Sequence, residues 1–319
     1  MASEIFIPNS LAFPEEGARD CRWGEGSYRP GERRACRTAM DQLMKAPWLH
    51  FFSEFVGTAL LIAVGLSVVI LNFGAGSPVV ALFPNPGIRL VITGFLFGAT
   101  GGIIALSPIG KVSGAHINPV VSLAFCLLGK LRARHALGYV LAQLCGAGLG
   151  GLPLLAWGRM GASIAFGATV PGTGYSAVAA TLGELATTSA LIIGLIIFLG
   201  HPRLRVFTPC LFPFLYAVMV YLEAPISGTS TNPARSLGPA LISGDWHDWW
   251  VYWVGPVLGS LIGLSLYRLT RLRLQRLEVE VAKLYHFEYD PHGFFRWERS
   301  EGGRGPSQGQ PRGSSGGRV

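Results

Sequence analysis

Two ten-residue stretches, SGAHINPVVS at 113–122 and SGTSTNPARS at 227–236, hold the residue types best suited to orient a small polar molecule. In both, a Ser-Gly pair and an Asn-Pro pair are separated by three residues. Asn is a favoured helix N-cap and Pro suits the first helical position, so each Asn-Pro pair predicts a helix start. The runs that follow, 118–128 and 232–242, would each be about 16 Å long, roughly half of a bilayer core.

Such half-helices predict a water-filled passage through the membrane and no covalent chemistry. Backbone without helical register is tolerated at membrane depth only where it is buried in protein or lines a water-filled cavity. If the two half-helices enter from opposite sides and meet N-terminus to N-terminus, their partial positive ends repel cations. The side-chain amides of Asn118 and Asn232 could then donate hydrogen bonds to a passing molecule.

The rest of the chain supplies the elements that must position these stretches. Of 319 residues, 50% are hydrophobic and 14% are charged, whereas a soluble domain carries roughly 25% charged residues. Apolar runs of about 20 residues are long enough to cross a bilayer. The sequence therefore predicts an all-α membrane protein with six transmembrane helices and two re-entrant half-helices. The six runs lie near 48–72, 88–106, 135–157, 178–200, 205–225 and 248–268.

The chain also contains an internal repeat. Glu54 in the first run matches Glu184 in the fourth, and Tyr139 in the third matches Tyr252 in the sixth. Each copy would hold three spans and one half-helix. Because three is odd, the copies would enter the membrane from opposite sides, which is an inverted repeat.

Basic residues predict the orientation. With both termini in the cytoplasm, 23 of the 26 Lys and Arg residues lie on the cytoplasmic side, as the positive-inside rule requires. The expected organisation is a cytoplasmic arm at 1–47, a channel domain at 48–270 with repeats at about 48–157 and 178–270, and a basic cytoplasmic tail at 271–319. No basic domain with interleaved aromatic residues is present, so we expect no nucleic-acid partner.

Two alternatives remain for the start of the tail. Residues 268–284 alternate basic and aliphatic residues and could extend the sixth span as a surface helix on anionic lipid headgroups. The same residues could equally form a solvated basic segment that only fixes topology. The end of the tail, 300–319, is rich in Gly, Ser and Arg and is expected to be disordered.

The two Asn-Pro motifs resemble the paired signature of the aquaporin, or major intrinsic protein, family, and look especially like bacterial and plant water channels. The likeness covers about residues 48–270 and extends to Glu54 and Glu184, which match carboxylates that brace the re-entrant loops in the family. The motif residues are Asn118, Pro119 and Val120 in the first copy and Asn232, Pro233, Ala234 and Arg235 in the second. Val120 stands where the family usually has Ala, which implies a small shift in packing.

The resemblance implies a passive channel for water, with room for small neutral solutes, in a multi-pass protein of the cell membrane. It implies a homotetramer with one pore per subunit, contacts with membrane lipids, and no enzymatic activity, cofactor or metal. The alternatives are a glycerol-type facilitator and a secondary transporter. Facilitators usually have Asp directly after the second motif's Arg, and Ser236 at that position favours the water branch.

The resemblance also assigns an outer constriction to four positions. Arg235 would supply a fixed positive charge, and Thr229 would supply a backbone carbonyl. Val220 stands where strict water channels place His, which implies a wider and less polar opening. The fourth wall maps to Phe97, with Gly98 as the alternative if the alignment shifts by one residue.

Overall fold

The computed structural model describes residues 47–274, 278–291 and 293–295. The chain divides into two compact units, Met1–Leu49 and His50–Val319. The expected cytoplasmic arm, apart from Pro47, and the expected disordered end at 300–319 lie outside the described residues. Everything below concerns the second unit, together with the first turn of α2.

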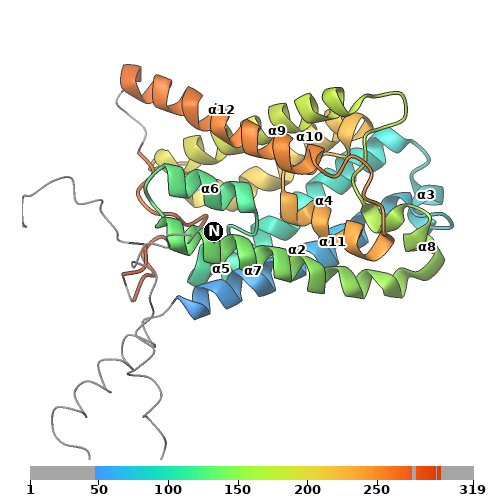
Figure 1. The fold of residues 1–319 in the computed structure, drawn as a ribbon, viewed down its shortest axis with the longest axis horizontal. Coiled ribbons are helices and arrows are strands. Elements are labelled where there is room, and N and C mark those ends of the chain that lie inside the picture. Colours follow the sequence, from blue (N-terminus) through green and yellow to red (C-terminus); the bar gives the residue numbers. More distant parts are fainter. Residues whose placement is uncertain (1–46, 275–277, 292, 296–319) are drawn as a thin grey trace, which may run out of the picture. The chain divides into compact units, whose positions relative to one another are not determined.

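The described residues form helices and no strands, so the all-α prediction is confirmed (Figure 1). Among the described residues, five segments are long and apolar enough to cross a membrane: Trp48–Phe73, Pro86–Leu106, Ala133–Ala162, Ala177–Gly200 and Arg205–Ser227. A sixth helix has 24 residues, about 36 Å at 1.5 Å per residue. The long helices are α2 (Trp48–Phe73), α4 (Pro86–Leu106), α7 (Ala133–Gly151), α9 (Ala177–Gly200), α10 (Thr208–Ser227) and α12 (Val251–Leu274).

Two short helices begin at the Asn-Pro pairs. α6 (Pro119–Leu127) has 9 residues and α11 (Pro233–Ser243) has 11, so neither can span a bilayer alone. The other short elements connect the long helices. They are α3 (Pro78–Leu82), α5 (Pro108–Ser113), η2 (Leu152–Trp157), α8 (Gly158–Ala162), η3 (Ala165–Gly167) and η4 (Arg205–Phe207).

Glycines allow the long helices to pack closely. A Cβ at Gly98 of α4 would collide with the backbone carbonyl of Phe212 on α10. Gly146 of α7 lies in the same way against α2, and Gly259 of α12 against α9. Small residues at helix interfaces let backbones approach in membranes, where no hydrophobic effect drives helices together. In Figure 1, α9, α10 and α12 lie along one side of the bundle, and α9 contacts both α10 and α12.

The residues that the structure describes after α12 begin at 278 and form no helix. Residues 278–284 are not helical, so a surface helix extending to 284 is wrong for these residues. They return instead to the first Asn-Pro region, where the backbone N–H of Leu284 donates to the carbonyl of Gly114 at 3.0 Å. Val279, Ala282 and Leu284 are buried there. Burial of these side chains outweighs the weak helical preference of the basic and aliphatic pattern.

Candidate functional site

The two stretches before the Asn-Pro pairs have the same unusual backbone. We call residues 113–118 the first re-entrant loop and 227–232 the second. Both contain a glycine and two other residues with positive φ, namely Gly114, Ala115 and Ile117 in the first loop and Gly228, Thr229 and Thr231 in the second. Positive φ is costly for residues other than glycine and persists where surrounding contacts enforce it. The loops must therefore be held by side chains from the spanning helices.

Glu54 of α2 holds the first loop. Its Oε1 accepts from the backbone N–H of His116 at 2.9 Å, and its Oε2 accepts from that of Ile117 at 2.7 Å. The side-chain amide of Gln143 on α7 also donates to Oε2, at 2.8 Å. The carboxylate is completely buried, and these three donors replace the water that it loses.

Glu184 of α9 holds the second loop in the same manner. It accepts from the backbone N–H groups of Ser230 at 2.6 Å and Thr231 at 2.7 Å, and from the Ser227 hydroxyl at 2.7 Å. This carboxylate is also completely buried. In both halves of the chain, one glutamate thus takes up two adjacent N–H groups that an extended loop leaves without helical partners.

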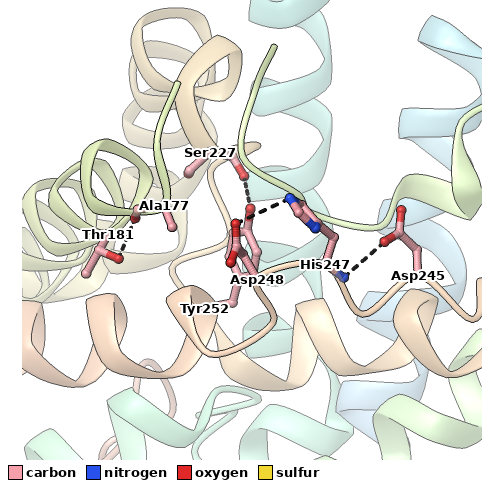
Figure 2. Close-up of polar contacts among 7 residues, drawn as sticks. All are labelled: Ala177, Thr181, Ser227, Asp245, His247, Asp248 and Tyr252. Carbon is pink, nitrogen blue, oxygen red and sulfur yellow. Dashed lines mark hydrogen bonds and ion pairs between the residues drawn. The ribbon is translucent and has the colours of Figure 1, made fainter. Parts of the chain in front are cut away.

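Two tyrosines fix where each loop begins. The Tyr139 hydroxyl donates to the carbonyl of Ser113 at 2.7 Å, and the Tyr252 hydroxyl donates to that of Ser227 at 2.8 Å. Figure 2 shows Tyr252 reaching Ser227 next to the turn that leads into α12, where His247 pairs with Asp248 at 3.4 Å. The sequence repeat identified the tyrosines as equivalent, but gave no indication of their hydrogen bonds.

The two motif asparagines join the loops to each other. Asn118 donates from Nδ2 to the carbonyl of Thr231, and Asn232 donates from Nδ2 to the carbonyl of Ile117, both at 2.9 Å. Their Oδ1 atoms accept from the backbone N–H of the residue after the motif proline, at 3.0 Å in each half. An amide nitrogen carries two hydrogens, so one N–H of each asparagine remains for a molecule beside it.

Both asparagines line a central cavity with a volume of about 40 Å³, large enough for a few waters. A wider outer cavity of about 220 Å³ adjoins it. Phe97 and Tyr216 line both cavities and therefore lie at the boundary between them. The outer cavity brings together the four residues assigned to the constriction: Phe97, Val220, Thr229 and Arg235. Gly98 lines only the central cavity.

Arg235 is buried and held in one orientation. Its Nη1 donates to the carbonyl of Gly167 at 2.7 Å, and its guanidinium carbon lies 6.0 Å from the centre of the Phe97 ring. Arginine stays charged in proteins, so the outer cavity has a fixed positive charge on its wall. A water or another small molecule in this cavity would find hydrogen-bond donors there and no free carboxylate among the residues that line it.

Sequence reasoning missed one charged group near this constriction. Glu223 of α10 is 6% exposed, and its Oε2 accepts from the Thr229 hydroxyl at 2.5 Å. The carboxylate therefore fixes the residue whose carbonyl was assigned to the constriction. A glutamate inside the apolar run 205–225 was the available signal, because intramembrane carboxylates are rare and usually have a defined role.

Val120 does not line either described cavity. It is 1% exposed, and its carbonyl accepts a 3.3 Å hydrogen bond from the Ser260 hydroxyl of α12. Its larger side chain is therefore taken up in packing away from both cavities. The remaining motif residues Pro119, Pro233 and Ala234 are buried as well and form the first turns of α6 and α11.

His116 uses both ring nitrogens within the protein. Nδ1 lies 3.1 Å from the Ser122 hydroxyl, and Nε2 lies 3.0 Å from the carbonyl of Ala282. Because a carbonyl only accepts, Nε2 carries the hydrogen. Among the residues that the structure describes, no group of three or more His, Cys, Asp or Glu side chains is placed to hold a metal ion.

The sequence and the fold of this chain are similar to those of known proteins. A profile of the major intrinsic protein family matches residues 42–267. Aquaporin Z from Bradyrhizobium diazoefficiens is 37% identical over 208 residues, which cover 61% of this chain and 85% of that protein. Aquaporin NIP1-1 from Zea mays is 33% identical over 249 residues, covering 77% and 83%. The X-ray structure of the aquaglyceroporin from Plasmodium falciparum has a TM-score of 0.56 at 21% identity, covering 70% of this chain and 96% of that one, and shares the fold.

Proposed function

The chain belongs to the major intrinsic protein family, whose members are membrane channels and not enzymes, and from this premise we propose that its pore conducts water and also admits small neutral solutes. The observation that carries the proposal is the grouping of Phe97, Val220, Thr229 and Arg235 around one cavity beside the paired asparagines. The proposed pathway is passive, and no side chain along it has to react.

The outer constriction selects by charge and polarity. The Arg235 guanidinium donates hydrogen bonds that replace part of a solute's hydration, and its charge repels cations. Val220 contributes an apolar wall that cannot donate. An opening with one polar side and one apolar side suits water, and it also suits a small neutral solute with both polar and apolar surface.

The centre excludes protons. The free N–H groups of Asn118 and Asn232 donate to the oxygen of one water, which turns both of its hydrogens away from the centre. A water oriented in this way cannot relay a proton along the file. The N-terminal ends of α6 and α11 add partial positive charge at the same point, which raises the barrier for any cation.

The assembly around the pore follows the family pattern. We place the protein in the cell membrane with both termini in the cytoplasm, because 23 of 26 basic residues then lie on that side. Large apolar side chains are exposed on the outside of the bundle, among them Leu60, Ile103, Leu137 and Leu182. Such surfaces fit membrane lipid and the neighbouring subunits of a homotetramer.

A glycerol-type facilitator is the second candidate, because Val220 leaves the constriction without a hydrogen-bonding side chain on that wall. Ser236 favours the water branch, because glycerol facilitators usually have Asp directly after the second motif's Arg. Its hydroxyl bonds to those of Thr169 at 2.7 Å and Ser230 at 2.6 Å. Stopped-flow measurements on proteoliposomes, with water, glycerol, urea and ammonia side by side, decide between the two. Glycerol permeability that exceeds water permeability would contradict the water-channel assignment.

A further inference from the structure

We propose that residues 278–291 and 293–295, called here the C-terminal segment, are a plug that closes the pore mouth beside the first re-entrant loop, with Leu284 as the blocking side chain. The segment lies beyond residues 42–267, which match the family profile. The proposal rests on the channel function above. Leu284 would thus form a constriction that residues 48–270 alone do not contain.

Leu284 lines the central cavity together with Asn118 and Asn232. The leucine is 3% exposed, and its backbone N–H donates to the carbonyl of Gly114 at 3.0 Å. An apolar side chain across a narrow mouth offers water no hydrogen bond, and hydrophobic constrictions close pores by excluding water. The docked segment thus ends the water file at Leu284.

A second backbone contact fixes the segment on the first re-entrant loop. The carbonyl of Ala282 accepts from Nε2 of His116 at 3.0 Å. His116 also lines the central cavity, so the segment takes up a donor that would otherwise face the pore. The two contacts, at Ala282 and Leu284, hold the plug by its backbone on both sides of one residue.

That intervening residue, Lys283, anchors the segment. Its side chain is completely buried, and Nζ donates to the carbonyls of Lys111 and Tyr289, both at 2.6 Å. The ammonium also lies 5.0 Å from the Phe295 ring centre and 5.3 Å from that of Tyr289. Cation–π contacts and carbonyl acceptors together replace part of the water around this buried lysine.

An aromatic stack holds the far end of the segment. The Phe294 ring lies 3.9 Å from the His50 ring at an interplanar angle of 12°, and 4.4 Å from the His135 ring at 14°. The ion pair of Glu280 with Arg205, at 2.9 Å, contributes little because Glu280 is 67% exposed. The described residues of the segment form neither helix nor strand. They are held by a few backbone contacts and side-chain anchors, so we infer that the segment can leave the mouth as a unit.

Water permeability of the full-length chain tests the plug. Leu284→Ala should raise permeability per channel by about threefold or more, because it removes the apolar block. Lys283→Glu should give a similar rise, because a carboxylate cannot remain among the carbonyls of Lys111 and Tyr289. Val281→Ala is the matched control, since Val281 belongs to the segment but does not line the cavity. Its water permeability should equal that of the parent. Equal permeability of all four proteins would overturn the plug.

Thiol labelling gives a test that does not depend on conduction. Gly101→Cys, in a chain whose five native cysteines are replaced by Ser, places a thiol in the central cavity. A Cβ at Gly101 has no neighbour nearer than Ile117 Cδ1 at 4.0 Å. A membrane-impermeant thiol reagent should label this cysteine about tenfold faster when Lys283→Glu is added, because the mouth is then open.

The two readouts separate the proposals. Faster labelling with no conduction in any variant would support the plug and contradict the channel function. Labelling rates that do not change on Lys283→Glu, in a chain that conducts water, would overturn the plug and leave the channel function intact.

Discussion

Asn118 and Asn232 each donate a 2.9 Å hydrogen bond to the backbone of the other's re-entrant loop, so the two halves of the chain are joined reciprocally beside the central cavity. Neither loop can shift without breaking a bond made by the other. The remaining N–H of each asparagine therefore has a fixed direction. We infer that the central site is rigid, and that its selectivity depends on contacts made some distance from it.

Removing either bracing carboxylate should destabilise the protein. Glu54→Ala leaves the buried N–H groups of His116 and Ile117 without partners, at a cost of about 1–3 kcal/mol each. Glu184→Ala should have a similar effect through the second loop. Thermal unfolding in detergent, followed by size-exclusion chromatography, measures both. Glu280→Ala is the exposed control, and a melting temperature as high as that of the control would refute the bracing role.

The contact between α4 and α10 should tolerate no side chain at Gly98. Gly98→Ala places a methyl group against the carbonyl of Phe212, whereas Gly101→Ala on the same helix has open space. Overpacking of this kind typically costs about 1–3 kcal/mol. The same unfolding assay should show a lower melting temperature for Gly98→Ala alone. Equal loss in both variants would mean that helix α4 responds to any added methyl group.

Val220→His should reduce solute leak more than water flux. The imidazole would fill part of the outer cavity beside Arg235 and add a donor that water can use. Stopped-flow swelling with glycerol and with water gives the two permeabilities for each protein. Val220→Leu, which adds size without polarity, controls for the change in volume. If the parent channel already excludes every solute larger than water, the role assigned to Val220 is wrong.

The plug should tighten as pH rises above about 8. Burial lowers the pKa of Lys283 from 10.5 to about 8, an effect that Asp290 opposes and Lys111 strengthens. His286 also faces this lysine, through its backbone carbonyl at 3.4 Å. Between pH of about 8 and 10.5, Lys283 of the docked segment has lost its proton, whereas the same lysine in the released segment keeps it. Docking therefore becomes more stable as pH rises through this window. Below about pH 8 both states are protonated, and docking does not depend on this lysine's titration.

Water permeability measured from pH 7 to pH 10 checks this sign. The parent channel should lose permeability above about pH 8, and Lys283→Met, which cannot titrate, should show a flat profile over the same range. A permeability that rises with pH in the parent would contradict the assignment of Lys283 as the titrating anchor.

Sequence patterns predicted the helices and the half-helix starts, because apolar length and Asn-Pro caps are local signals. Asn118 and Asn232 were identified in this way, and both have the capping geometry expected of them. The hydrogen bond between Leu284 and Gly114 joins residues 170 positions apart. No local sequence pattern predicts such a distant contact. Glu223 was overlooked because its neighbours have the composition of an ordinary transmembrane helix. Its contact with Thr229 depends on the conformation of the second re-entrant loop, which the sequence does not reveal.

In the proposed channel, the paired asparagines let water pass and exclude protons and ions. Water flux and proton or cation leak should be measured in the same proteoliposomes for the parent, Asn232→Asp and Asn118→Asp, each in the Leu284→Ala background so that the mouth is open. We expect rapid water flux without ion leak in the parent. Both variants should show reduced water flux or a new cation leak, because a carboxylate there offsets the positive ends of α6 and α11. Unchanged water flux and unchanged ion exclusion in both variants would contradict this proposal.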